Sequence, residues 1–118
     1  MLSASLRHAF AGLFLAACSE EPAHSGPPDG AALFKQQNCV TCHGPDGDGT
    51  NLGPTLRGKK VFWTREKLAG YLSDPQSVIR GDERLETQAG KYMLPMVKFV
   101  GLTQEQRLAL ADFVLGLP

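Results

Sequence analysis

Two cysteines and a histidine lie together in NCVTCHGPDG: Cys39, Cys42 and, directly after it, His43. A Cys-x-x-Cys pair serves thiol redox chemistry, structural zinc binding or covalent haem attachment. Thioredoxin-like chemistry belongs beside a β-α-β pattern, which this sequence lacks. A structural zinc site needs four ligands, and residues 29–118 offer only these two cysteines and one histidine. The Cys-x-x-Cys-His order therefore predicts covalent attachment of a c-type haem, with His43 as a ligand of its iron.

A haem iron has a second axial position, and the sequence offers few side chains for it. His43 is the only histidine after His24, which lies in a Pro-rich segment where we expect a solvated side chain. Met93 and Met96 both lie in KYMLPMVKF, and a thioether is a soft ligand that suits ferrous iron. Each methionine could also be a flexible filler of the hydrophobic core. The residue pattern alone leaves the choice between the two open.

Capping residues and apolar spacing predict helices on both sides of this motif. Asp29 is a suitable N-cap for a helix through GAALFKQQN, residues 30–38. Thr64 can cap a second helix in WTREKLAGYL, where apolar side chains recur at i, i+3 and i+4. This helix should end at Asp74, because Pro75 disfavours a helical conformation of the residue before it.

The last helix has the clearest signals. Its start, TQEQ from Thr103, is a capping box. It carries one apolar stripe, formed by Leu110, Phe113, Val114 and Leu117. No segment shows the sustained alternation of a strand, so we predict an all-α domain. The segment DERLETQAGKYMLP, before Met96, is charged in its first half and is expected to be a solvated loop, with a loop that docks a partner as the alternative.

The first 28 residues have the pattern of an export leader and a linker. AFAGLFLAA is an apolar run of nine residues, far too short to span a bilayer. It ends in Leu-Ala-Ala-Cys18, which resembles the lipobox of bacterial lipoproteins, where the chain is cut before the cysteine and the cysteine is acylated. We expect a signal peptide at 1–17, a lipid-anchored linker at 18–28 and one compact domain at 29–118. A plain secretory signal with an incidental cysteine is the alternative.

These motifs together resemble the class I cytochromes c, which are small and monohaem. The resemblance covers most of residues 30–117 and is most specific at CVTCHG, residues 39–44. Further matching features are Gly30 to Phe34, Gly53-Pro54, Trp63-Thr64, the run Leu68, Tyr71, Leu72 and Pro75, and a methionine before the final helix. The resemblance implies the small cytochrome c fold, with helices and loops around one covalently attached haem c and its iron.

The resemblance also implies roles for single residues. In the family the ligand methionine precedes an aromatic residue of the final helix by a fairly constant interval, which favours Met96, seventeen residues before Phe113. A loop proline, here Pro54, supplies the carbonyl that orients the ligand histidine. Trp63 resembles the tryptophan that meets a haem propionate, and Tyr71 resembles the tyrosine near the methionine sulfur. The segment before Met96 is longer than in the shortest family members, which is a departure from the pattern.

The expected function is single-electron transfer by an exported, membrane-tethered monohaem protein that is not itself an enzyme. The chain has 12 basic and 12 acidic residues, so its charge does not indicate nucleic-acid binding. Expected partners are redox proteins of the bacterial periplasm or membrane, and we expect a monomer. The alternatives are the haem subunit of a larger redox enzyme complex, and a haem domain with an open sixth position that binds small ligands.

Overall fold

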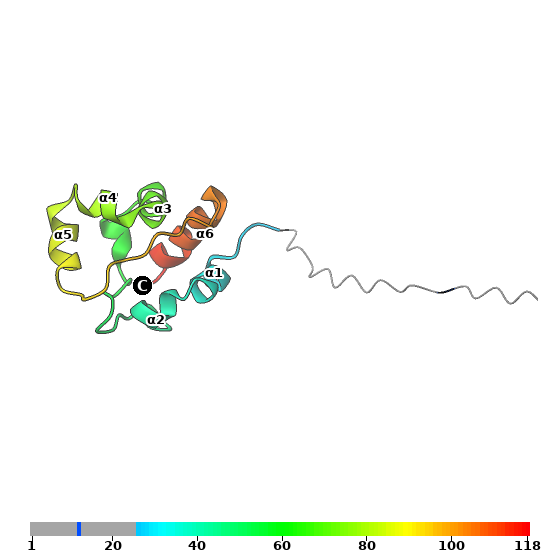
Figure 1. Ribbon diagram of the computed structural model, residues 1–118, viewed down its shortest axis with the longest axis horizontal. Helices are drawn as coiled ribbons and strands as arrows, with labels where there is room; N and C mark the ends of the chain where they lie inside the picture. The colour runs from blue at the N-terminus through cyan, green and yellow to red at the C-terminus, as the bar shows by residue number, and fades with distance from the viewer. Residues whose placement is uncertain (1–11, 13–25) are drawn as a thin grey trace, which may run out of the picture.

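The computed structural model describes Gly12 and residues 26–118 (Figure 1). The predictions of a signal peptide and of a lipid site at Cys18 concern residues outside this range, apart from Gly12. The elements are α1 (Gly30–Gln36), α2 (Cys39–His43), the 3-10 helix η1 (Lys59–Val61), α3 (Arg65–Ser73), α4 (Pro75–Ile79), α5 (Glu83–Ala89) and α6 (Gln104–Leu115). The described residues contain no strand, so the all-α prediction is confirmed. None of their helices has the length and apolar character needed to cross a membrane.

Helix α1 begins where the sequence predicts it. The Asp29 carboxylate accepts hydrogen bonds from the backbone N–H groups of Ala31 and Ala32 at 3.0 and 3.2 Å. These two donors would otherwise have no partner inside the helix. The helix buries Leu33 and Phe34 against α6, where the Phe34 ring lies 5.2 Å from that of Phe113. This contact joins the two ends of the domain.

Helix α3 also packs against α6. The Thr64 side chain accepts a hydrogen bond from the Lys67 backbone N–H at 3.2 Å, as its position predicts. The buried face consists of Leu68, Ala69 and Leu72. The helix ends at Ser73, and Pro75 then becomes the first residue of α4, a place where its missing N–H costs no hydrogen bond.

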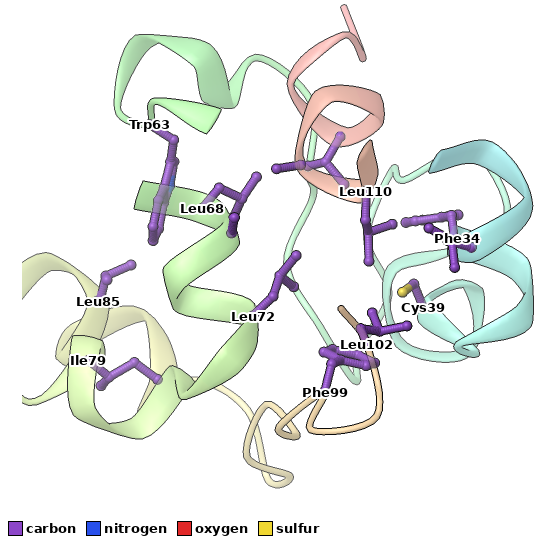
Figure 2. Packing of buried hydrophobic residues seen from close by; sticks show 14 residues of the cluster. Phe34, Cys39, Trp63, Leu68, Leu72, Ile79, Leu85, Phe99, Leu102 and Leu110 are labelled. Carbon is purple, nitrogen blue, oxygen red and sulfur yellow. The ribbon is translucent and has the colours of Figure 1, made fainter. Parts of the chain in front are cut away.

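Helix α6 carries the complete capping box. The Thr103 hydroxyl accepts from the Gln106 N–H at 3.1 Å, and the Gln106 side chain accepts from the Thr103 N–H at 2.8 Å. Leu110 and Val114 of the predicted stripe are buried, while Phe113 and Leu117 are half-buried. Figure 2 shows Leu110 beside Phe34 of α1, with Leu68 and Leu72 of α3 on its other side, so the core lies between α6 and these two helices.

The prediction of a solvated loop before Met96 is wrong in one respect, because this segment contains helix α5. The Asp82 carboxylate caps this helix by accepting from the N–H groups of Arg84 and Leu85 at 3.0 and 3.2 Å. Leu85 is only 3% exposed and lies near Trp63 and Ile79 in Figure 2. One buried side chain in a seven-residue helix leaves no periodic pattern, which explains why charge dominates the sequence signal.

The contact between α1 and α6 depends on Gly30. A Cβ atom at Gly30 would overlap the Ala109 carbonyl oxygen and lie 2.8 Å from the Phe113 Cβ. We therefore expect Gly30→Ala to push the two helices apart and to destabilise the protein by about 1–3 kcal/mol, as overpacking does. Gly70→Ala in α3 is the control, since its Cβ meets nothing within 4 Å. Thermal unfolding of the holoprotein measures both, and equal melting temperatures would contradict this role of Gly30.

Candidate haem-binding site

One cavity of about 250 Å³ runs through the domain between α2, the loop at 52–56, α3, α5 and the segment at 92–99. Most of its wall is apolar and comes from the core, including Phe34, Leu68, Leu72 and Leu110. The wall also contains all seven residues of the domain that the sequence predicts for the site: Cys39, Cys42, His43, Pro54, Trp63, Tyr71 and Met96. Residues far apart in the sequence are thus brought to one space.

Helix α2 places both cysteines and the histidine on this cavity. Its single turn starts after Asn38, which has a left-handed backbone (φ 58°), and ends at Gly44, with φ 84°. Asparagine and glycine are the residues that tolerate such conformations. The Thr50 hydroxyl donates to the Cys42 carbonyl oxygen at 2.6 Å, which ties the following loop to this turn. The sharp turns at both ends fix the three side chains against one wall.

The His43 ring is oriented by the loop that contains Pro54. Its Nδ1 lies 2.8 Å from the Pro54 carbonyl oxygen, so Nδ1–H donates and Nε2 carries the lone pair that a metal requires. Burial lowers the pKa of His43, and the hydrogen bond to Pro54 opposes this shift. The loop can come this close because residue 53 is glycine: a Cβ there would lie 3.0 Å from the Cys42 carbonyl oxygen and 3.2 Å from the imidazole.

Cys39 is not suited to thiol redox chemistry. Both Cys39 and Cys42 are free cysteines, and burial raises the pKa of Cys39 to about 11. Reactive cysteines need the opposite shift, because the thiolate is the nucleophile. Among residues 26–118, no three side chains of the His, Cys, Asp and Glu types are grouped as a metal site.

The two methionines have different positions. Met96 is half-buried, packs against the core and lines the cavity. Met93 is 97% exposed and lies outside the cavity wall, so the core-filler interpretation of this residue is wrong. The difference arises because Phe99 is buried and its N–H donates to the Leu72 carbonyl oxygen at 3.0 Å. This contact places the preceding residues 94–97 along the cavity wall.

Trp63 and Tyr71 form an aromatic corner of the cavity. Their rings meet at 5.2 Å with an interplanar angle of 67°, the edge-to-face arrangement that aromatic pairs prefer. Trp63 is 9% exposed, and the Lys67 ammonium lies 5.3 Å from its ring centroid. Burial raises the pKa of the Tyr71 hydroxyl, which keeps it in the protonated form.

The structure adds residues to the wall that the sequence did not indicate. Helix α5 contributes Arg84, Gln88 and Ala89, and η1 contributes Lys59. The available signal was the i, i+4 spacing of Arg84 and Gln88 beside the apolar Leu85, which places all three on one side of a helix. That signal is too short to identify without the fold.

The donors on this cavity fit one haem c. Two cysteine sulfurs lie one helical turn apart, a neutral imidazole has its Nδ1 occupied by Pro54, and a thioether lies in the wall of an apolar space. Apolar surroundings and soft or imidazole ligands are the protein's means of holding a haem iron. The site therefore defines a protein with covalently attached haem. The cytochrome c family model matches residues 28–118, and the chain belongs to this family.

Curated relatives agree with this assignment. The chain is 36% identical to "Cytochrome c type-1" of Ascaris suum over 44% of its own length and 63% of that protein. It is 35% identical to "Cytochrome c 2.1" of Caenorhabditis briggsae, with the same coverage. It is 34% identical to "Cytochrome c oxidase subunit 2" of Alkalihalophilus pseudofirmus over 53% of the chain but only 21% of that protein. The chain thus spans less than two thirds of these relatives, and no solved structure gives a significant match.

Proposed function

We propose that this protein is an exported, lipid-anchored carrier of single electrons, with a haem iron ligated by His43 and Met96. The observation that supports this most directly is the shared cavity. His43 and Met96 line the same space as the two cysteines of the attachment motif, and the His43 ring is already held at Nδ1 by Pro54. Met93 is exposed and away from that space.

The chain's own residues do the work of a carrier rather than of an enzyme. When bound, the haem supplies a reversible one-electron couple at its iron. Cys39 and Cys42 would hold it in place, while the apolar wall would exclude water and lower the local dielectric constant. His43 and Met96 would both bind the iron, which would leave no open position on it for a substrate.

Optical spectra of the purified holoprotein test this ligation. We expect the weak sulfur-to-iron charge-transfer band in the oxidised form and no spectral change when carbon monoxide is added to the reduced form. Binding of carbon monoxide by the wild type would contradict it, and would favour a haem domain with an open sixth position.

A second candidate function is that of a haem subunit in a larger redox enzyme. The similarity to a cytochrome c oxidase subunit 2 over 53% of the chain is the observation that favours it. Native gels of gently solubilised membranes, stained for haem, separate the two. A carrier migrates as a monomer, whereas a subunit remains in a complex with other chains.

We also propose that the protein works at a membrane surface of the bacterial periplasm, with redox proteins rather than nucleic acid as partners. The linker after Cys18 is rich in Pro, Ser and Glu. Ten such residues reach at most about 35 Å, which keeps the haem domain near its membrane. A short tether of this kind limits the search for a partner to one surface.

The lipid anchor predicts the behaviour of a Cys18→Ala variant. We expect this variant to appear as a soluble periplasmic protein or as an unprocessed precursor, because the acylated residue has been removed. Fractionation with haem staining follows the location, and Ser19→Ala serves as the control that should stay in the membrane. Mass spectrometry that finds an unmodified Cys18 at the N-terminus of the native protein would contradict the anchor.

A further inference from the structure

The cavity wall has an unbalanced charge. Among the described residues that line it, Lys59 and Arg84 are cationic and none is an aspartate or glutamate. The Arg84 side chain is 37% exposed, and a positive charge at the rim of an apolar space attracts an anionic group there. The cavity therefore fits a ligand that is apolar over most of its surface and anionic where it meets these side chains.

The Arg84 guanidinium is held at this wall by its neighbours. Its Cζ lies 4.9 Å from the ring centroid of Phe62 and 5.8 Å from that of Trp63. Aromatic faces attract the guanidinium cation but do not use its N–H groups as hydrogen-bond donors. These N–H groups therefore stay available for a carboxylate. These contacts fix the charge beside Trp63, at the corner of the cavity.

The carboxylate nearest to Arg84 does not neutralise it by a close ion pair. Asp82 Oδ2 lies 3.9 Å from Arg84 Nη2, which is beyond hydrogen-bond distance. The other oxygen, Oδ1, accepts the backbone N–H groups at the start of α5. Asp82 thus serves mainly as the helix cap, and the guanidinium can still form a bidentate pair with another carboxylate.

We propose that Arg84 is a positioning residue that pairs with a propionate carboxylate of the haem and raises its midpoint potential. This inference rests on the haem site described above. A haem carries two propionates at one edge of an otherwise apolar ring, which matches the charge pattern of the cavity. A fixed positive charge disfavours the ferric state, because that state carries one more positive charge than the ferrous state.

Helix α5 brings Arg84 to the haem site. This helix lies in the segment where the chain is longer than the shortest members of its family, and it places Arg84, Gln88 and Ala89 on the cavity wall. Leu85 anchors the helix in the core beside these residues. The insertion therefore adds one cationic side chain to the cavity wall rather than only a loop in solvent.

Potentiometric titration of the holoprotein tests the proposal. Arg84→Gln removes the charge, and we expect the one-electron equilibrium to shift threefold to tenfold toward the ferric state, a fall of roughly 30–59 mV at about 59 mV per tenfold change. Arg84→Lys keeps the charge without the fork and should recover part of the fall. Arg80→Gln is the control, since Arg80 is exposed, lies outside the cavity wall and changes the net charge equally.

Two results would overturn the proposal: equal potentials for Arg84→Gln and Arg80→Gln, or a potential of Arg84→Lys no higher than that of Arg84→Gln. A purely structural role of Arg84 would lower the melting temperature without this charge-dependent order of potentials. Failure of the His43 and Met96 ligation would appear separately, as carbon monoxide binding by the wild type. The haem-stained gel of each variant shows in addition that the cofactor is attached.

Discussion

Replacement of both Cys39 and Cys42 by alanine is expected to abolish haem attachment and stable folding together. The cavity that the haem would fill is bounded by the same side chains that form the core, such as Leu68, Leu72 and Leu110. Left empty, a cavity of about 250 Å³ would cost up to about 6 kcal/mol at the roughly 24 cal/mol per Å³ found for emptied cores. This is comparable with the whole stability of a small domain, about 5–15 kcal/mol.

Haem-stained denaturing gels and circular dichroism melts measure the two losses. The double variant should show no haem band and no cooperative transition near that of the wild type. Thr41→Ala is the matched control, because Thr41 lies between the two cysteines with its side chain exposed. A haem-free wild-type domain that folds normally would be inconsistent with a haem-dependent core.

The sequence predicts those features of the site that depend on neighbouring residues. The attachment motif lies within one turn, α2, and the caps at Asp29, Thr64 and Thr103 depend on side chains two or three residues from the N–H groups they bind. Such short-range signals survive without knowledge of the fold. The haem, the helical class and the start of each of these helices were therefore accessible from the sequence.

Contacts across the fold were less accessible. The bond from His43 to Pro54 spans eleven positions, and residue spacing alone cannot specify it; the family resemblance pointed to it. Helix α5 was missed because its only buried side chain is Leu85, so charged residues dominate its composition. The position of Arg84 above two aromatic rings depends on that helix, and no local pattern indicates it.

The choice between the two methionines as iron ligand was also beyond the reach of short-range sequence patterns. They lie three positions apart in a segment without helix or strand, where periodicity says nothing about which side chain faces inward. The structure distinguishes them through Phe99, whose burial and backbone bond to Leu72 set the path of the chain. Met96 consequently turns to the cavity and Met93 to solvent.

Met96→Ala is expected to remove the sulfur ligand of the iron. The sulfur-to-iron band of the oxidised protein should disappear, and the reduced protein should bind carbon monoxide, because an axial position is then free. The midpoint potential should fall, since a thioether favours ferrous iron and alanine offers no donor. Optical titration with carbon monoxide and potentiometry measure these effects on the same sample.

Met93→Ala is the control, because it removes the other methionine of the same segment. Met93 is 97% exposed, so its truncation should change stability by no more than about 0.5 kcal/mol and leave the band, the potential and the resistance to carbon monoxide unchanged. Loss of the band in this variant, with retention in Met96→Ala, would mean that the segment binds the iron in a register three residues earlier. Absence of the band from the wild type itself, together with carbon monoxide binding, would mean that no methionine is the ligand, and the proposed electron carrier would give way to a haem domain of another kind.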